Sequence, residues 1–424
     1  MAACRMVSNR VQKLMLASPL ILIWLSVPAV AGTTFLMFPP ENQSKVQGLA
    51  WIGEGLAIAI SEELLAPDVE TISWEERLRF IESSDLPPNT LLSRASMIRV
   101  AQKAAADQLV FGSYAGTRDN LHIVLRVLDL KSLRLSGEIA ANGPMSALPQ
   151  LENELAWVIL SDMGLNGALS REDFRARSRT VPNGPYSSFI SCLAVSDGAK
   201  RAKMLLKTVE LYRNFPQASF LVGVYYFEKG DCVRAIQYLK PALKAAQSFL
   251  EAEFMLGTCY LKQDKPAEAV QAYNAVVKRC PALEVLNNLG VAYLRRGNYP
   301  LAAQNLVEAC NLAKTDLTVG LNLAILRHLQ GDEPAALAIL NEMVKVHADQ
   351  GMLQYLYSLA LESRGDSRKA AVALDQAKKL GVDPEKVKRQ DPRSWTQIFP
   401  TWTRRPVVTW GGKIGFDGDR SQRH

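Results

Sequence analysis

Small residues recur at nearly constant spacing in the second half of the chain, each inside an apolar helical pattern. After each of the first three, the residues three and four positions later are apolar or aromatic, which is the spacing of one face of an amphipathic α-helix. Steps of 34, 33, 34 and 34 residues separate Gly223, Gly257, Gly290, Ala324 and Ser358. Because a period of about 20–50 residues is typical of stacked repeats, this spacing predicts five helical hairpins over residues 216–383.

Turn residues follow the first helix in most of these copies. Glycine adopts a left-handed backbone at little cost and commonly ends a helix. The predicted helix ends are Gly230, Gly297, Gly331 and Gly365. The next residues suit the start of a second helix, and they are Asp231, Asn298, Asp332 and Asp366. A single hairpin cannot bury its apolar face whereas stacked neighbours can, so the pattern predicts an all-α stack.

The motif residues of these hairpins resemble those of the tetratricopeptide-repeat (TPR) family. The third copy reads Asn287-Asn288-Leu289-Gly290-Val291-Ala292-Tyr293, and the second has Leu256-Gly257 followed by Tyr260. The last two copies lack the glycine and the tyrosine of the first helix. The resemblance covers about residues 216–383, and it implies a right-handed superhelix whose first helices line a concave groove.

The resemblance also implies which side chains face that groove. The expected partner-binding positions are Phe220, Val224, Phe227, Phe254, Thr258, Leu261, Asn287, Val291, Leu294, Arg295, Leu321, Ile325, His328, Tyr355 and Leu359. Most are apolar or aromatic, so we expect the groove to hold a protein or peptide partner by shape and buried apolar contacts. The charged set that grips a terminal carboxylate in some TPR proteins is not reproduced, and Asn288 and Asn322 are interpreted as ordinary consensus positions.

Strand and helix patterns alternate over residues 32–166, which predicts an α/β domain with a mixed sheet. Strands are expected at 34–38, 69–73, 109–115, 121–128 and 133–140, and helices at 51–65, 92–106 and 145–163. The polar segment 167–185 is expected to be an interdomain linker. Residues 186–215 are expected to form a degenerate helical hairpin before the five repeats.

Short motifs in the α/β region resemble the amino-terminal domain of the periplasmic Tol-system propeller protein. They include Phe35-Leu36-Met37-Phe38-Pro39-Pro40-Glu41-Asn42, Gly53-Glu54-Gly55-Leu56 and Arg126-Val127-Leu128-Asp129-Leu130. The similarity spans most of residues 34–165. It implies a domain that serves contacts with other proteins and not catalysis.

Residues 1–31 have the pattern of a secretory signal peptide. Arg5, Arg10 and Lys13 precede a long apolar run, which ends in Ala29-Val30-Ala31. We therefore expect a periplasmic or secreted protein after signal cleavage. The alternative is an uncleaved inner-membrane anchor formed by residues 14–31, because that run approaches the length of a spanning helix.

Composition is typical of a folded globular protein, with 48% hydrophobic and 21% charged residues. The net charge of +7 is concentrated at the two ends, so no nucleic-acid partner is expected. Five cysteines follow the signal segment, and none has Cys-x-x-Cys spacing. We expect these five, Cys192, Cys232, Cys259, Cys280 and Cys310, to be free core thiols.

Motifs for catalysis, metal binding and cofactor binding are not found. The four histidines include no His-Glu-x-x-His and no paired metal-ligand spacing. Gly53-Glu54-Gly55 lacks the third glycine of a dinucleotide fingerprint and is interpreted as a structural turn. The competing hypothesis is an enzyme or nucleotide-binding protein with its site in the α/β domain, where Glu41 and Glu54 are the residues to test.

Residues 384–424 form a basic tail that is rich in tryptophan. Its aromatic residues include Trp395, Phe399, Trp402 and Trp410, and a disordered tail rarely carries so many. We expect residues 391–410 to dock on the superhelix, as a cap or as an occupant of the groove. The alternative is a basic aromatic anchor that makes peripheral contact with an anionic membrane surface.

Taken together, the patterns favour a non-catalytic TPR scaffold or adaptor of the bacterial cell envelope. It would bind protein partners through its helical groove and its N-terminal domain. The alternatives are the enzyme or nucleotide-binding protein described above and a peripheral membrane assembly factor anchored by the tail.

Overall fold

The computed structural model describes residues 32–402 except 45, 47, 67, 88–90, 196 and 246–249, together with the strand pair at 406–408 and 414–416. The predicted signal segment 1–31 and Trp410 lie outside the described residues. The chain divides into two compact units, and the division falls between Tyr225 and Tyr226. The first unit contains a sheet and the second is helical.

The sheet of the first unit has the strand order β3-β1-β4-β5-β6, and β2 also pairs with β4. The strands are β1 (Thr33–Met37), β2 (Glu41–Asn42), β3 (Val69–Thr71), β4 (Gln108–Gly116), β5 (Leu121–Asp129) and β6 (Ile139–Gly143). β1 is parallel to β3 and β4, whereas β4, β5 and β6 are antiparallel to one another. The sheet is therefore mixed, as predicted.

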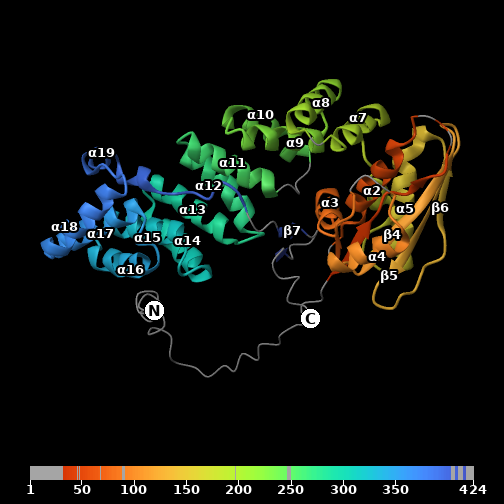
Figure 1. The fold of residues 1–424 in the computed structure, drawn as a ribbon. Coiled ribbons are helices and arrows are strands. Elements are labelled where there is room, and N and C mark those ends of the chain that lie inside the picture. Colours follow the sequence, from red (N-terminus) through yellow and green to blue (C-terminus); the bar gives the residue numbers. More distant parts are fainter. Residues whose placement is uncertain are drawn as a thin grey trace. The chain divides into compact units, whose positions relative to one another are not determined.

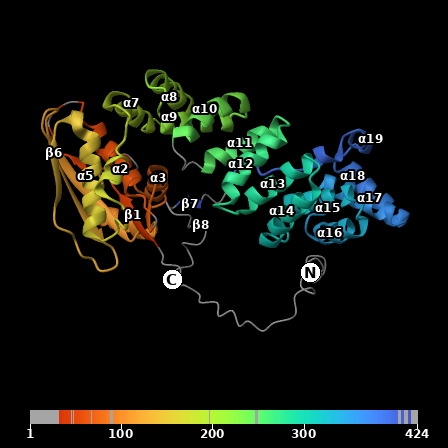
Figure 2. The ribbon, with the colours of Figure 1, turned by 180° about the vertical axis from the view of Figure 1, so that it is seen from behind.

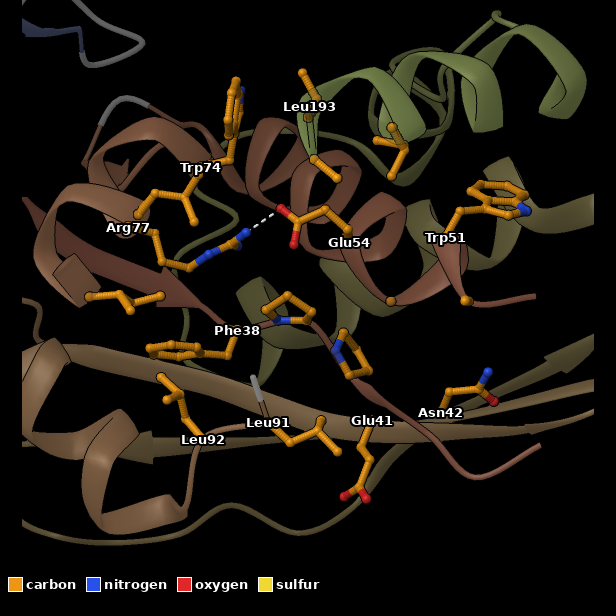
Figure 3. A pocket seen from close by; sticks show the side chains of 18 of the residues that line it. Phe38, Glu41, Asn42, Trp51, Glu54, Trp74, Arg77, Leu91, Leu92 and Leu193 are labelled. Atoms are coloured by element: carbon orange, nitrogen blue, oxygen red, sulfur yellow. Dashed lines mark hydrogen bonds and ion pairs between the residues drawn. The ribbon is translucent and has the colours of Figure 1, made fainter. Parts of the chain in front are cut away.

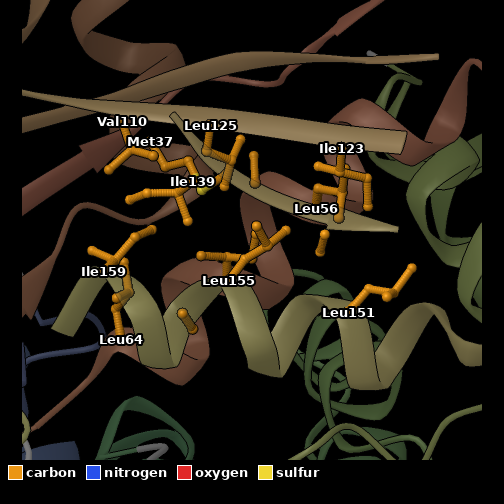
Figure 4. Packing of buried hydrophobic residues seen from close by; sticks show 14 of the residues in the cluster. Met37, Leu56, Leu64, Val110, Ile123, Leu125, Ile139, Leu151, Leu155 and Ile159 are labelled. Carbon is orange, nitrogen blue, oxygen red and sulfur yellow. The ribbon is translucent and has the colours of Figure 1, made fainter. Parts of the chain in front are cut away.

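Helices cover both faces of this sheet. These helices are α2 (Trp51–Leu64), α3 (Trp74–Glu82), α4 (Arg94–Lys103) and α5 (Leu148–Asp162). They are followed in the chain by the short α6 (Arg171–Arg175) and by α7 (Asn183–Leu193), α8 (Gly198–Leu211) and α9 (Pro216–Glu228). Figure 4 shows α5 beneath the sheet, with Leu155 and Leu56 directed toward Ile123. The opposite face packs Leu36 and Leu109 against α3 and α4. Alternate residues of a strand thus enter different cores.

Two sequence predictions in this unit were wrong. The last strand runs over 139–143 and not 133–140, because Leu133 has a left-handed backbone (φ 55°) and residues after Asp129 form a connection. Gly53-Glu54-Gly55 is not a turn, since it lies in the first turns of α2. There the absence of a Gly53 side chain matters, because a Cβ would lie 2.6 Å from the Pro40 carbonyl oxygen.

The segment predicted to be a linker, 167–185, packs within the first unit. It forms α6 and places the Phe174 side chain in the main core, fully buried. Asn153 of α5 donates to the Phe174 carbonyl oxygen at 2.8 Å. Its apolar contacts come from a few residues, Leu169, Phe174 and Val181, among many charged ones, which is why the composition of the segment indicated a linker. The predicted degenerate hairpin follows as α7 and α8.

The second unit consists of helical hairpins (Figures 1 and 2). Its helices are α10 (Cys232–Ala245), α11 (Leu250–Lys262), α12 (Pro266–Val277), α13 (Leu283–Arg295), α14 (Tyr299–Leu312), α15 (Leu317–Leu329), α16 (Glu333–Val346), α17 (Gly351–Ser363), α18 (Ser367–Lys379) and α19 (Pro384–Lys388). The two helices of a hairpin approach closely only because the predicted positions carry small residues. A Cβ at Gly257 would lie 2.7 Å from the Tyr273 ring, and one at Gly290 would lie 2.7 Å from Leu306.

The predicted turns between the paired helices are confirmed. All four predicted glycines have positive φ, between 72° and 80°. The following side chains cap the next helix through backbone N–H groups, and these caps are Asp231, Asn298, Asp332 and Asp366. At the equivalent place after α11 the sequence has Asp264, which adopts φ 55°. A non-glycine residue there carries a conformational cost.

The predicted fold class, a mixed α/β domain followed by an all-α TPR superhelix, is confirmed. The five cysteines Cys192, Cys232, Cys259, Cys280 and Cys310 are buried, and none forms a disulfide in the part of the chain that the structure describes. No helix among the described residues has the length and hydropathy to cross a bilayer.

A tail-filled groove as the candidate functional site

The tail of the second unit lies on the first helices of the hairpins. After α19 a short 3₁₀ turn, η3 (Pro392–Trp395), leads into an extended stretch that continues to Trp402. The Asp391 side chain caps this turn by accepting from the Arg393 backbone N–H at 2.9 Å. Hydrogen bonds of the Arg393 side chain lower the pKa of the Asp391 carboxyl group. The turn fixes where the extended stretch begins.

Two asparagines hold the main chain of this stretch. Asn322 of α15 donates to the Gln397 carbonyl oxygen at 2.7 Å and accepts from the Gln397 N–H at 2.8 Å. Asn288 of α13 makes the same pair of bonds with Phe399, at 2.9 and 2.8 Å. Because alternate residues of an extended chain share one face, both amide pairs can form on the same side of the tail.

The two clamping asparagines are themselves held by a buried polar network. Asn322 donates to Asn287 Oδ1 at 2.8 Å, and Asn287 donates to the Gln397 carbonyl oxygen at 3.3 Å. Asn288 also donates to the Tyr273 hydroxyl at 3.2 Å. All three asparagines are fully buried. A buried amide without partners is costly, so this network favours a groove that has peptide main chain in it.

Aromatic side chains of the tail fill the groove at both ends of the clamp. Trp395 stacks on His328, with ring centroids 6.3 Å apart, and meets Tyr355 edge-on at 5.9 Å. Trp402 packs on Phe254 of α11 at 5.4 Å and is 6% exposed. The indole N–H groups of both tryptophans are buried without a hydrogen-bond partner among the described residues.

Arg295 gives the groove a positive charge close to the tail. Its Nε donates to Thr396 Oγ1 at 3.1 Å, and another guanidinium nitrogen donates to the Leu261 carbonyl oxygen at 3.0 Å. Burial lowers the pKa of the guanidinium group. Within the described residues it forms no ion pair. A hydroxyl or carboxylate oxygen on the bound segment is therefore the natural neighbour of Arg295.

The structure sorts the predicted groove positions into three groups. Those in contact with the tail are Phe254, Asn287, Arg295, His328 and Tyr355. Those that are buried and make none of the tail contacts described above are Phe227, Thr258, Leu261, Val291, Leu294, Leu321 and Ile325. Leu359 is half-buried on α17, and Phe220 and Val224 lie on the part of α9 that is in the first unit. Of the predicted tail-docking residues, Trp395, Phe399 and Trp402 lie against the helices.

Sequence reasoning missed the two residues that do most to hold the tail, Asn288 and Asn322. Both were interpreted as consensus positions. The signal was present, because they lie 34 residues apart and thus occupy equivalent places on neighbouring first helices. Two amides one repeat apart can both pair with the main chain of one extended segment.

The first unit contains a cavity that bears on the competing enzyme hypothesis. Glu41 and Glu54 both line it, but Glu54 is ion-paired with Arg77. No group of three or more His, Cys, Asp or Glu side chains in the described ranges is arranged to hold a metal ion. The arrangement offers a binding surface, and no nucleophile with an adjacent general base is seen there among the lining residues.

The first unit also buries two carboxyl groups around one arginine. Arg179 forms a two-pronged pair with Glu152, at 2.8 and 3.2 Å, and Glu152 is fully buried. Glu63 is 6% exposed, and Asn153 of α5 lies beside its carboxyl group. Burial, reinforced by the Glu152 charge, raises the pKa of Glu63 to about 8, although Asn153 acts to lower it. Burial raises the pKa of Glu152 to about 7, with Arg179 opposing it.

Comparison with known proteins identifies the repeats. Residues 223–283 and 254–310 match the family model described as "Tetratricopeptide repeat". The hairpins in this part of the chain are therefore tetratricopeptide repeats, as the motif residues indicated. The match lies outside residues 34–165, so the resemblance of that region to the Tol-system domain stays a prediction. No curated protein sequence matches this chain.

Several solved structures match part of this chain. The crystal structure of MamA is 21% identical and covers 39% of this chain and 97% of its own, with a TM-score of 0.36. YrrB, described as a TPR protein with an unusual peptide-binding site, is 16% identical and covers 45% and 100%, with a TM-score of 0.38. PilF of Pseudomonas aeruginosa is 16% identical and covers 49% and 100%, with a TM-score of 0.39. At these values the likeness assigns no partner and no activity to this chain.

Proposed function

We propose that this chain is a protein-binding scaffold of the cell envelope whose repeat groove takes up an extended peptide segment of a partner. The observation that carries the proposal is the pairing of Asn288 and Asn322 with both main-chain groups of alternate residues in the tail. Placement in the envelope rests on the signal-peptide pattern of residues 1–31.

Main-chain pairing makes the groove tolerant of sequence at the clamped residues. The clamp needs an N–H and a carbonyl group at two positions two residues apart, so it excludes proline there and little else. Selectivity would come from the flanking contacts: an aromatic group against His328 and Tyr355, and another against Phe254. The partner segment we propose is thus extended, free of proline at the clamp, and aromatic at both ends.

The chain's own tail then acts as an intramolecular occupant that a partner must displace. Its two buried indole N–H groups lack hydrogen-bond partners in the described residues, and each such group costs about 1–3 kcal/mol. The tail consequently binds the groove less tightly than its buried contact area alone would predict. A partner segment that carries phenylalanine at these two places would avoid this cost.

Photo-crosslinking in the envelope tests the proposal. A photoreactive residue replaces Leu359 on the first-helix side, and the control replaces Leu312, which is 59% exposed at the end of a second helix. Gln397→Pro removes the N–H that Asn322 accepts, whereas Gln397→Ala keeps it. We expect Gln397→Pro to release the tail and to raise partner crosslinking from position 359 several-fold over Gln397→Ala, with no change from position 312. Equal crosslinking by the two variants would contradict the proposal.

A further inference from the structure

The first unit contains a cavity of about 570 Å³ that is separate from the repeat groove. It lies where the parallel strands β1 and β3 end and the helices α2 and α3 begin, with Phe38 following β1 and Trp51 and Trp74 opening the two helices. In open α/β sheets, ligands bind in the crevice beyond the carboxyl ends of parallel strands. Its volume falls within the range of roughly 300–1,000 Å³ that small-molecule sites have.

The walls of the cavity are mostly apolar. Phe38 and Leu92 lie across the cavity from Glu54 in Figure 3, and Trp51 and Trp74 stand on the helices above them. The Trp51 ring is held by Tyr186 of α7, with ring centroids 6.1 Å apart in an edge-to-face contact. A fixed aromatic wall favours a flat or branched apolar group and can also face a cation.

One carboxylate is the polar group that the cavity presents most openly. Arg77 is 4% exposed. It forms an ion pair with Glu54 and donates a hydrogen bond to the Met37 carbonyl oxygen at 2.9 Å. The Glu54 side chain is 30% exposed. Among the described residues of the lining, Glu41 is the other acidic residue and Arg77 is the basic one. The basic group is therefore covered, whereas the Glu54 carboxylate is partly accessible from the cavity.

We propose that this cavity binds a small apolar amine, that is, an aromatic or branched apolar group that carries a protonated nitrogen. The apolar group lies against Trp51, Trp74 and Phe38, and the ammonium group donates to the Glu54 oxygen that faces the cavity. An anion is disfavoured, because Glu54 already occupies the first turn of α2 and the Arg77 guanidinium is covered.

Three probes of one shape test the charge preference: 2-(1-naphthyl)ethylamine, 2-(1-naphthyl)ethanol and 1-naphthaleneacetate. Binding to the full mature chain is measured by calorimetric titration and by saturation-transfer NMR. We expect the amine to bind at least about tenfold more tightly than the acid, with the alcohol between them. Equal or tighter binding of the acid, or no binding of the amine at millimolar concentration, would overturn the proposal.

Two variants locate the site. Glu54→Gln should reduce the affinity of the amine to that of the alcohol, while Glu82→Gln, an exposed acid at the end of α3 outside the cavity, should leave it unchanged. Glu54→Gln also removes the partner of Arg77 and can unfold the unit. Ser191→Trp avoids this, because Ser191 is exposed at the cavity and has no contact with that ion pair. It should abolish binding of all three probes; unchanged binding would place the amine elsewhere and refute the assignment.

Discussion

Both units bury polar side chains, but they satisfy them differently. In the repeat unit three of the buried groups are neutral amides, Asn287, Asn288 and Asn322, and main-chain groups of the tail complete their hydrogen bonds. In the α/β unit two of the buried groups are carboxyl groups, Glu152, which is paired with Arg179, and Glu63, whose pKa is raised by burial. The first arrangement depends on whether a segment is bound, and the second depends on pH.

Removing the two clamping amides of the repeat unit, Asn288 and Asn322, should have the largest effect. Asn288→Ala with Asn322→Ala removes four hydrogen bonds to the main chain of Gln397 and Phe399, and it leaves the Gln397 carbonyl oxygen only the longer bond from Asn287. We expect the tail to leave the groove and the free energy of unfolding of the repeat unit to fall by about 2–4 kcal/mol. Urea unfolding and protease cleavage after residue 390 measure the two effects.

The matched control for the double variant is Asn305→Ala. Asn305 lies on a second helix and donates only to the Leu301 carbonyl oxygen of its own helix, at 2.8 Å. It should leave the tail protected from protease. If the double variant kept the tail equally protected, the amides would not be what holds it.

Replacing a buried carboxyl group of the α/β unit should change the free energy of unfolding by a smaller amount, and this change should depend on pH. The folded-state pKa of Glu63 is raised to about 8, well above the unfolded value of about 4.3. Its neutral form is the one that folding favours, so the unit is most stable below the unfolded pKa and loses stability as the pH rises toward 8. Glu63→Gln should remove much of this slope and stabilise the unit at pH 8 by on the order of 2 kcal/mol.

Urea unfolding at pH 5.5 and pH 8 measures that slope. Glu152 and Glu62 act on Glu63 in the same direction and Arg179 acts against them, so part of the slope should remain in Glu63→Gln. Glu82→Gln, at the exposed end of α3, should behave as the unchanged protein does. A Glu63→Gln variant with an unaltered slope would show that this carboxyl group is ionised or solvated in the folded state.

The smallest expected effect tests backbone strain in the repeat unit. Asp264 has φ 55° where other hairpins have glycine. Asp264→Gly should raise the free energy of unfolding by about 0.5–1 kcal/mol, because glycine adopts this conformation without a Cβ clash. The reciprocal Gly297→Asp, at φ 74°, should lower it by a similar amount. Thermal unfolding of both variants checks the sign, and opposite shifts are the expected result.

Repetition explains why the second unit was predictable in detail. A hairpin is a local structure, and its closest contacts, such as Gly257 with Tyr273, join residues near in sequence. The first unit was predicted in outline, but α3 was missed although Ser73 and Glu76 form a capping box at its start. Phe174 was taken for part of a linker because its burial depends on contacts with distant residues, which no local pattern shows.

The candidate sites were less predictable for the same reason. The sequence indicated that an aromatic tail docks on the repeats, but the clamp depends on Asn288 and Asn322 meeting residues more than 70 positions away. The cavity near Glu54 required the ends of two strands and two helices to be placed in space. Periodicity predicts which helix face a residue occupies, and it does not predict which distant main-chain group that residue will meet.

Titration of a peptide with the sequence of residues 391–402 into the chain shortened to end at Gln390 tests the central claim most directly. We predict saturable binding to the shortened chain, binding at least about tenfold weaker to the full chain, whose groove is occupied, and a similar loss when proline replaces Gln397 in the peptide. Equal binding of the two peptides, or of the wild-type peptide to the two chains, would contradict a main-chain clamp in the groove.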